Sequence, residues 1–296
     1  MARIGFVGLG HMGLPMAINL VQAGHTVTGY DLQPEALSAF SAAGGLSAHS
    51  LQQASQDQEI IITMLQTGQQ VKQVCLGDKG LFAAASPQAL FIDCSSIDVS
   101  SSRELHEQAL NYKLLVVDSP VSGGVAGASA ATLTFMVGGM VDALEAARPI
   151  LACMGKKIIH TGKAGSGQAA KICNNMILGV SMIAVSEAFI LGQQLGLEPE
   201  KLFDVVTSSS GQCWAMSHYA PVPGVLENVP ANHDYKPGFS AAMMLKDLKL
   251  SQQSAAAVGV KTPMGERAAA LYQQFNAEGM AGLDFSAIIK LLGNKD

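Results

Sequence analysis

One stretch decides the fold: Ile4-Gly5-Phe6-Val7-Gly8-Leu9-Gly10-His11-Met12-Gly13-Leu14-Pro15-Met16-Ala17. It predicts a short apolar strand, a glycine turn and the first turns of a helix. The spacing Gly8-x-Gly10-x-x-Gly13 is typical of a loop that binds a dinucleotide. Gly8 allows the tight turn, Gly10 lets the backbone approach a pyrophosphate, and Gly13 lets helix and strand pack closely. We therefore expect phosphates at the start of this helix, bound by the loop residues Gly8, Gly10, His11, Met12 and Gly13.

The acid that accompanies such a loop is also present. A second apolar segment, residues 26–30, follows the predicted helix and ends at Asp31. An acid ~20 residues beyond the glycines hydrogen-bonds the adenosine ribose in this class of fold. A glycine turn followed by a solvated aspartate is the alternative, but it leaves the order of strand, helix, strand and acid unexplained. The Asp31 carboxylate would repel a 2′-phosphate, and no Lys or Arg lies between Ile4 and Val71 to neutralise one. The predicted cofactor is therefore NAD, not NADP.

The composition indicates a folded chain of two domains. Its 296 residues suggest two domains at roughly 150 residues each. Apolar residues make up 49% and charged residues 14%, so we expect a large core and no disorder. The net charge of −5 and the lack of a basic run argue against nucleic acid or an anionic membrane as a partner.

Two further features predict a cytoplasmic location. Five scattered cysteines without a CxxC pair fit a reducing compartment. The most membrane-like segment, Met176–Gly192, contains Ser181, Ser186 and Glu187, which make it too polar for a spanning helix.

Apolar strands alternate with helical segments in the first half of the chain, which predicts a parallel, doubly wound sheet. The predicted strands are residues 4–7, 26–30, 59–65, 89–94, 114–118, 132–137 and 157–160. From Gly167 onward we expect only helices, at residues 168–195, 200–208, 242–257, 263–275 and 285–292. The fold class is thus α/β: an N-terminal Rossmann-type domain, residues 1–163, joined by a long helix to an all-helical domain, residues 164–296. The joining helix is nearly free of charge, so we expect it to be buried on most sides and the chain to form a homodimer or homotetramer.

In such a sheet, ligands collect beyond the carboxyl ends of the strands. The most suggestive strand end is Asp118-Ser119-Pro120-Val121-Ser122-Gly123-Gly124. The Ser122 hydroxyl and the N–H groups of Gly123 and Gly124 could hold a carboxylate or an oxyanion. An ordinary Ser/Gly loop explains the same spacing equally well.

Lys171 and Asn175 are the strongest catalytic candidates. They lie four residues apart and so share one face of the predicted long helix, whose only other charge is Glu187. A buried lysine can have its pKa lowered toward neutrality, which suits proton transfer, and a neighbouring carboxamide can position the amine and a substrate hydroxyl. Most helix lysines are simply solvated, and this alternative is the rule for Lys246. Core packing is likewise the ordinary role of the single tryptophan, Trp214.

Other chemistries lack their motifs. The seven histidines form no HExxH or paired Cys/His spacing, so no metal site is expected. No GxSxG elbow of a hydrolase is present.

Together these motifs resemble the NAD(P)-dependent β-hydroxyacid dehydrogenases, and within them the 3-hydroxyisobutyrate dehydrogenase branch. The resemblance covers essentially the whole chain. It rests on the stretches Gly8–Ala17, Asp118–Gly124, Gly167–Asn175, Ser209–Gly211 with Trp214, Pro221–Val225 and Lys246–Leu248.

The resemblance implies roles for particular residues. Lys171 would be the catalytic acid/base with Asn175 beside it, and Ser122 and Gly123 would bind the substrate carboxylate. The cofactor would be lined by Met64, Leu65 and Ser96 and covered by Lys246, and the substrate pocket would be bordered by Trp214 and Tyr219. Two residues depart from the family pattern: Gln66 replaces a usual proline, and Gln212 replaces a frequent arginine near the region thought to set substrate choice.

The predicted activity is NAD-dependent oxidation of a small 3-hydroxy acid to its semialdehyde, with 3-hydroxyisobutyrate of valine degradation as the first substrate. Alternatives within the family are an L-serine dehydrogenase and a tartronate semialdehyde or glyoxylate reductase. A non-catalytic NAD-binding sensor is the alternative from another class, although a sensor has no need of Lys171 with Asn175.

Overall fold

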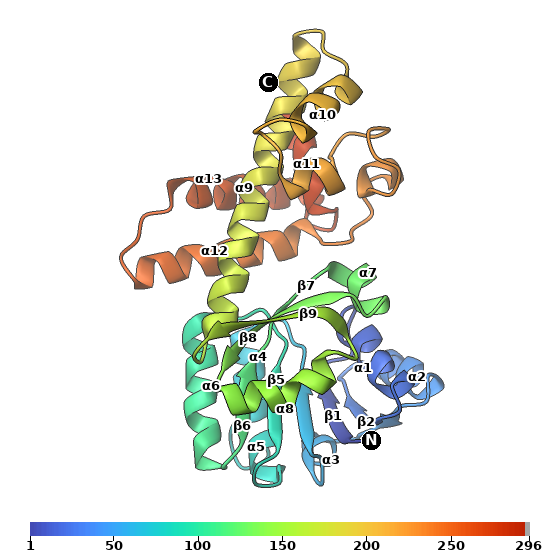
Figure 1. Cartoon of the computed structure of the whole chain (residues 1–296), viewed down its shortest axis with the longest axis vertical. Coiled ribbons are helices and arrows are strands. Elements are labelled where there is room, and N and C mark those ends of the chain that lie inside the picture. Colours follow the sequence, from blue (N-terminus) through green and yellow to red (C-terminus); the bar gives the residue numbers. More distant parts are fainter. Residues whose placement is uncertain (294–296) are drawn as a thin grey trace. The chain divides into compact units, whose positions relative to one another are not determined.

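The computed structural model describes residues 1–293. Two compact units make up the chain, Met1–Lys171 and Ile172–Asp296. The division falls inside the long helix α9 (Ser166–Gln194), which carries residues of both units (Figure 1). The predicted domain boundary between residues 163 and 164 lies just before this helix and stays a prediction.

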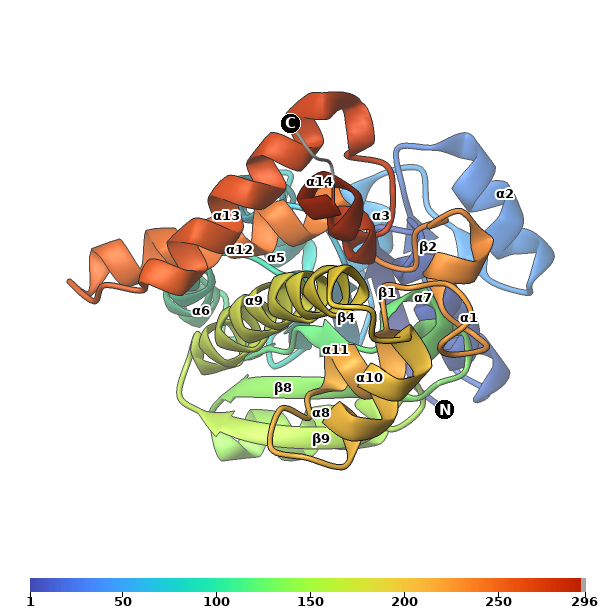
Figure 2. The same cartoon turned by 90° about the horizontal axis from the view of Figure 1, so that it is seen from above.

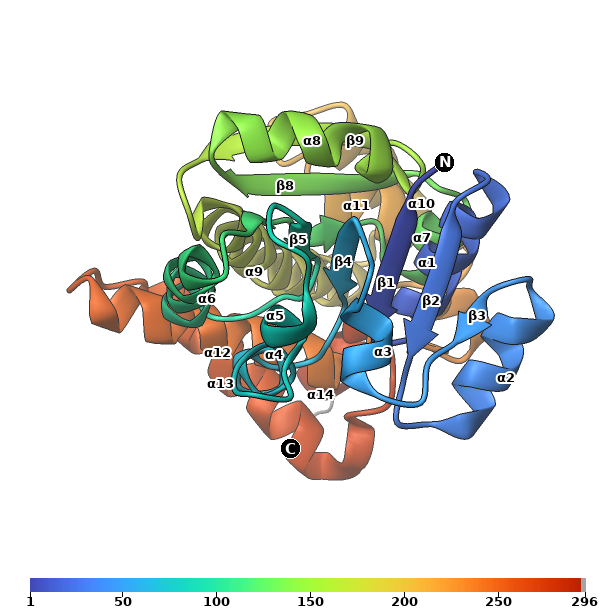
Figure 3. The same cartoon turned by 90° about the horizontal axis from the view of Figure 1, so that it is seen from below.

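A single sheet with helices on both faces forms the first unit. Its strands are β1 (Arg3–Val7), β2 (Thr26–Tyr30), β3 (Leu46–Ser47), β4 (Ile60–Thr63), β5 (Leu90–Asp93), β6 (Leu115–Asp118), β7 (Val121–Ser122), β8 (Leu133–Gly139) and β9 (Gly155–Gly162). They lie in the order β3-β2-β1-β4-β5-β6-β8-β7, with β9 on β8. Figure 3 shows β2, β1, β4 and β5 side by side. The carboxyl ends of β1, β4, β5 and β6 therefore meet at one edge of the sheet.

The prediction of a parallel sheet is confirmed from β3 to β6 but is wrong for β8. Strand β8 runs antiparallel to β6 and β7 and parallel to β9. The chain returns from β6 through the short β7 and the one-turn helix α7 (Gly124–Ser129) without a helical crossover, so it re-enters the sheet in the opposite direction. Strands β3 and β7 are two residues long, too short to produce a recognisable apolar pattern.

Alternate residues of the strands face opposite sides of the sheet, and both sides are covered. Ile4, Phe6 and Ile62 pack in the same core as α1 (Gly13–Gln22), α2 (Pro34–Ala42) and α8 (Val141–Leu151). Val7 and Ile61 face the other side. The helices there are α3 (Leu51–Ser55), α4 (Gly68–Cys75), α5 (Leu81–Ala84) and α6 (Val99–Asn111). This two-sided covering confirms the doubly wound architecture and accounts for the continuous apolar strands.

In the part of the chain that the structure describes, the second unit consists of helices joined by loops, with a single isolated β-bridge between Ser240 and Asp284. After α9 come α10 (Pro199–Thr207), α11 (Trp214–Tyr219), η1 (Pro230–His233), α12 (Ala241–Ala257), α13 (Pro263–Phe275), η2 (Asn276–Met280), η3 (Phe285–Ala287) and α14 (Ile288–Gly293). Helices α12 and α13 lie side by side (Figure 2). Met244 and Leu248 of α12 pack in one core with Phe189 of α9 and Tyr272 of α13. The predicted helix 285–292 is interrupted, because η3 and α14 divide it.

Parts of helix α9 are exposed in the single chain. Ile177 and Leu191 are 64% and 60% exposed. By length and composition alone, α9 could cross a membrane, but the core helix of a soluble protein can have the same length and composition. In this chain 44% of the most apolar part of α9 is buried. A charge-poor pattern identifies an apolar helix but not what covers it, so the expectation that α9 is buried on most sides, in part by another subunit, stays a prediction.

Candidate functional site

The glycine loop after β1 has the geometry of a phosphate cradle. Gly8 adopts φ +98°, and a Cβ at Gly13 would overlap the Gly8 carbonyl oxygen, so the backbone itself requires both glycines. At Gly10 a Cβ would meet no protein atom within 4 Å. Helix α1 starts beyond Gly10 with no side-chain cap from Met12. The missing side chain at Gly10 therefore leaves room in front of helix N–H groups, which fits the pyrophosphate of a dinucleotide.

Asp31 lies against this loop, as predicted. Its Oδ2 accepts the N–H of Leu9 at 2.6 Å, and its Oδ1 accepts the N–H of Gln33 at 2.9 Å. The side chain is half-buried at the end of β2, so its orientation is fixed while solvent still reaches it. His11 is exposed and Met12 half-buried in the same loop.

The predicted cofactor residues of β4 and β5 lie at the same edge of the sheet. Met64 donates its N–H to the carbonyl of Val7 at the end of β1, at 2.9 Å. Leu65 donates its N–H to the Ser95 hydroxyl, also at 2.9 Å. Since β4 and β5 pair in parallel next to β1, the loops that carry Met64, Leu65 and Ser96 are held beside the glycine loop. Gln66, the departure from the family's proline, is exposed, and its N–H donates to the Gln70 Oε1 of α4 at 3.1 Å, a bond that proline could not make.

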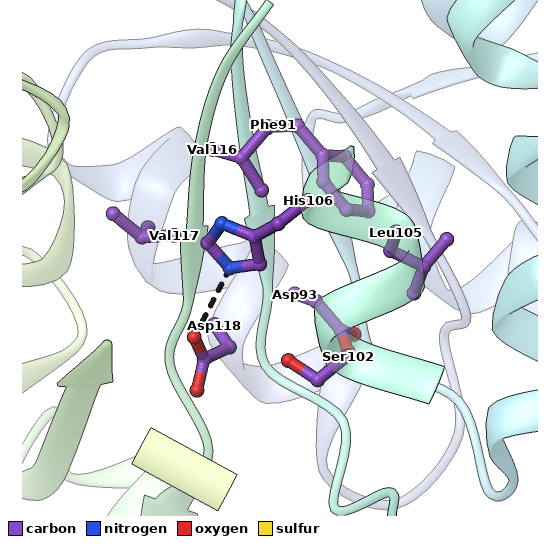
Figure 4. A pocket seen from close by; sticks show the side chains of 8 residues that line it. All are labelled: Phe91, Asp93, Ser102, Leu105, His106, Val116, Val117 and Asp118. Atoms are coloured by element: carbon purple, nitrogen blue, oxygen red, sulfur yellow. Dashed lines mark hydrogen bonds and ion pairs between the residues drawn. The ribbon is translucent and has the colours of Figure 1, made fainter. Parts of the chain in front are cut away.

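A buried polar cluster lies beneath this edge (Figure 4). The His106 Nε2 is 3.1 Å from the Asp118 Oδ1, and Asp93 and Ser102 face the same small pocket. Asp93 Oδ1 accepts the Thr63 hydroxyl and the Ser95 N–H, whereas its Oδ2 has no hydrogen-bond partner among residues 1–293. Burial therefore raises the pKa of Asp93 to about 6, against the lowering effect of these hydrogen bonds.

We expect the Asp93→Asn variant to be more stable than the wild type at neutral pH. The folded carboxyl, with a pKa of about 6, holds a proton more tightly than the unfolded one at 3.8, so wild-type stability falls as pH rises through this window. Asparagine keeps the Oδ1 acceptor and carries no charge. The free energy of unfolding should rise by about 2 kcal/mol at pH 7.5 and by close to zero near pH 4. Urea unfolding at both pH values measures it; an equal effect at both would contradict the role of ionisation.

The loop after β6 presents the predicted donors. Ser122 ends β7 and is half-buried, and Gly123 and Gly124 follow with φ of +135° and +61°. Two consecutive residues in the left-handed region make a sharp turn that only glycine adopts without strain. This turn is the predicted binding loop for a carboxylate.

Lys171 and Asn175 are both buried, at 8% and 2% exposure, one turn apart on α9. Asn175 Nδ2 donates to Asp247 Oδ2 of α12, and Asn175 Oδ1 accepts from the side chain of Asn174 at 3.0 Å. Its carboxamide is therefore fixed in orientation. Asp247 Oδ1 also lies 3.4 Å from Lys246 Nζ, which makes Lys246 an ion-paired side chain and not a simply solvated one.

The aromatic residues of the second unit form a stack. Trp214 is 50% exposed, which argues against the alternative of simple core packing, and its role at the substrate pocket stays a prediction. Its ring lies 5.1 Å from that of Tyr219, which in turn lies 5.2 Å from that of Phe285. The Tyr219 hydroxyl donates to the buried Asp284 at 3.0 Å, and burial together with this carboxylate raises the pKa of Tyr219. Gln212, the second departure from the family pattern, is exposed close by in sequence.

Sequence reasoning missed four buried or half-buried polar residues: His106, Asp118 and Gln168 in the first unit and Asp247 in the second. The spacing along α12 could have indicated that Asp247 is buried, because it lies three residues after Met244 and four before Ser251, which are both buried. Asp118 and Gln168 stand inside recognised motifs, but their partners come from distant segments that no local pattern identifies. No group of three or more His, Cys, Asp or Glu side chains that could hold a metal ion occurs in residues 1–293.

The first unit is a Rossmann sheet with a glycine loop and an acid after β2, and a helix with a buried lysine follows it. This combination is typical of dehydrogenases that use a dinucleotide cofactor. Comparison with known proteins gives the particular family. Residues 3–162 match the family model described as the NAD-binding domain of 6-phosphogluconate dehydrogenase, and residues 165–292 match the model for the NAD-binding region of NADP-dependent 3-hydroxyisobutyrate dehydrogenase.

Individual proteins of known name are similar to this chain over almost its full length. A Pseudomonas aeruginosa NAD-dependent L-serine dehydrogenase is 47% identical, covering 98% of both chains. A P. aeruginosa 3-hydroxyisobutyrate dehydrogenase is 46% identical, covering 100% of both chains. The solved structure of Mycobacterium tuberculosis 3-hydroxyisobutyrate dehydrogenase with L-serine is 50% identical with a TM-score of 0.95, covering 99% of this chain and 100% of that one. The chain belongs to the 3-hydroxyisobutyrate dehydrogenase family.

Membership of this family confirms the resemblance, the fold class, the oxidoreductase class and NAD as the cofactor. It gives no support to a non-catalytic sensor. The roles of the individual site residues stay predictions.

Proposed function

We propose that this enzyme oxidises 3-hydroxyisobutyrate to methylmalonate semialdehyde with NAD, as a step of valine degradation in the cytoplasm. The observation that carries the proposal is the buried Lys171, at 8% exposure on α9, with the fixed carboxamide of Asn175 one turn further on. A buried amine can lose its proton near neutral pH and so act as a base. A relative named 3-hydroxyisobutyrate dehydrogenase is 46% identical over the whole chain. A relative named NAD-dependent L-serine dehydrogenase is 47% identical over 98% of the chain.

The glycine loop and Asp31 would hold the cofactor. Gly10 leaves space for the pyrophosphate, and the Asp31 carboxylate would accept the ribose hydroxyls. Met64, Leu65 and Ser96 would line the cofactor, and Lys246 would cover it. When bound, NAD supplies the hydride-accepting group of the reaction.

The remaining residues would handle the hydroxy acid. Ser122 and the N–H groups of Gly123 and Gly124 would bind its carboxylate, and Trp214 and Tyr219 would border its side chain. Lys171 would accept the hydroxyl proton during oxidation and return a proton to the aldehyde oxygen in the reverse direction. Asn175, whose orientation Asp247 fixes, would hold the substrate hydroxyl toward the amine.

L-Serine is the second candidate substrate. It is also a small 3-hydroxy acid, and a relative with 47% identity is named for its oxidation. The solved M. tuberculosis structure, with a TM-score of 0.95, is that of the enzyme with L-serine. A tartronate semialdehyde or glyoxylate reductase remains an alternative of the same family.

A substrate panel tests the proposal. Purified protein is assayed for nicotinamide reduction with NAD or NADP and with 3-hydroxyisobutyrate, L-serine, D-glycerate or 3-hydroxypropionate. We expect the highest kcat/KM for 3-hydroxyisobutyrate with NAD. A higher kcat/KM for L-serine would transfer the proposal to the second candidate, a preference for NADP would refute the role of Asp31, and no turnover of any acid would refute the proposed activity.

We also propose that the enzyme is a homodimer or homotetramer. A groove of about 300 Å³ in the second unit is lined by Met176, Ile177, Val180, Ser181, Thr262, Pro263, Met264 and Gly265. Ile177 and Met264 are each 64% exposed there, and Val258 nearby in sequence is 72% exposed. Apolar surface of this kind supports contact with a second copy. Sedimentation that finds only monomer would contradict this proposal.

A further inference from the structure

Three segments of the first unit carry the residues to which the proposed function assigns roles. The loop after β5 carries Ser96, the loop after β6 carries Ser122, and the start of α9 carries Lys171. Two buried side chains, Asp118 and Gln168, connect these three segments by hydrogen bonds, and neither is expected to touch a substrate or a cofactor.

Asp118 joins the segment after β6 to the start of α9. Its side chain is 1% exposed, four residues before Ser122. Its Oδ1 accepts the Gly165 N–H at 2.8 Å, and its Oδ2 accepts the Gln168 N–H at 3.0 Å. His106 of α6 approaches the same Oδ1 at 3.1 Å (Figure 4). The carboxylate thus binds backbone N–H groups of the first turn of α9, where the helix dipole also favours a negative charge.

Gln168 joins the start of α9 to the loop after β5. It is 0% exposed. Its Oε1 accepts the Ile97 N–H at 3.1 Å, and its Nε2 donates to the Ser95 carbonyl at 2.7 Å. These two bonds use both the oxygen and the nitrogen of the carboxamide, and they bind the backbone directly before and after Ser96. A shift of α9 along its axis would break them.

We propose that Gln168 and Asp118 are positioning residues for the proton-transfer step. They fix the first turn of α9, and hence Lys171 three residues beyond Gln168, against the two loops that carry Ser96 and Ser122. This inference rests on the proposed function, which makes Lys171 the base. A proton acceptor works only within hydrogen-bond reach of its donor, and a displacement near 1 Å can cost ~100-fold in rate.

The Gln168→Met variant tests this inference with Ser55→Ala as its control. Methionine has a similar length and forms neither hydrogen bond. Ser55 is equally buried in the same unit, its hydroxyl donates to the Leu81 carbonyl at 2.6 Å, and its helix α3 carries no residue with an assigned role. We expect Gln168→Met to lower kcat ~10- to 100-fold and to change KM for NAD and for the hydroxy acid less than threefold. Ser55→Ala should lower Tm and leave kcat unchanged.

Equal kcat in Gln168→Met and the wild type, with a loss of Tm like that of Ser55→Ala, would overturn the inference. If Gln168→Met does not fold, Gln168→Glu replaces it. A neutral Glu carboxyl accepts from Ile97 and donates to Ser95, as Gln168 does, whereas an ionised one cannot donate. With Asp93, His106 and Asp118 nearby unchanged in both proteins, the kcat of Gln168→Glu relative to the wild type should rise as pH falls. A constant ratio would overturn the inference.

Amide hydrogen exchange separates this inference from the proposed function. Gln168→Met should speed exchange at residues 165–172, and Ser55→Ala should not. If the wild type turns over no hydroxy acid, the proposed function fails while this measurement still decides whether Gln168 fixes the start of α9. Unchanged exchange at residues 165–172 would overturn the positioning role even in an active enzyme.

Discussion

Replacing Lys171 by alanine is expected to lower kcat by ~10²–10⁴-fold, the usual cost of losing a positioned acid/base. The buried amine is the only group on this face of α9 to which the proposed function gives a proton-transfer role. Its removal should leave NAD affinity nearly unchanged, because the glycine loop and Asp31 belong to other segments. Lys171→Arg should fail as well, since arginine keeps its proton at any accessible pH.

Lys201 provides the matched control, because it is an exposed lysine on α10 with no assigned role. Steady-state kinetics of Lys171→Ala, Lys171→Arg and Lys201→Ala, together with NAD binding by calorimetry, measure these effects. Turnover close to that of the wild type in either Lys171 variant would remove this residue from the mechanism. A loss of NAD binding in Lys171→Ala would instead indicate a role in the cofactor site.

Two glycines of the same loop should respond in opposite ways to alanine. At Gly10 the new methyl group meets no protein atom within 4 Å, so Gly10→Ala should fold with an unchanged Tm. The methyl group would occupy the space expected for the pyrophosphate, so Kd for NAD should rise ~10-fold or more, equivalent to at least about 1.4 kcal/mol.

At Gly13 the methyl group would overlap the Gly8 carbonyl oxygen, so α1 must move away from β1. Gly13→Ala should therefore lose about 1–3 kcal/mol of stability even without cofactor. Thermal unfolding of the NAD-free variants and calorimetric titration with NAD test the pair. A destabilised Gly10→Ala with normal NAD affinity would contradict the location of the phosphate site.

The sequence predicts the strands of the first unit well because their burial on both faces leaves continuous apolar runs. The bounds of β2 and α13 agree with the prediction to the residue, and β5 differs by one residue at each end. The reversal of β8 was not predictable, since apolar patterns identify a strand and not its direction. The outcome depends on β7, which pairs antiparallel with β8 as β6 does, so that α7 turns the chain back instead of crossing over the sheet.

The site was predicted less completely, for a physical reason. Residues whose role follows from local spacing, such as Gly10 and Asp31, lie where the pattern places them. Gln168 and Asp118 act through partners ~50–70 residues away in sequence, and such pairs form only once the sheet is assembled. The exposure of Trp214 does not follow from its residue type, because large aromatic residues are usually buried and its environment depends on how α11 packs.

The half-exposed Trp214 has a practical consequence. It is the only tryptophan of the 296 residues, so the indole emission of the protein comes from this one ring. The ring stacks on Tyr219 and lies parallel to His218 at 6.1 Å. A change in intrinsic fluorescence when a hydroxy acid is added therefore reports on one named position of the second unit. Occupancy there can be followed without NAD turnover, and with inactive variants such as Lys171→Ala.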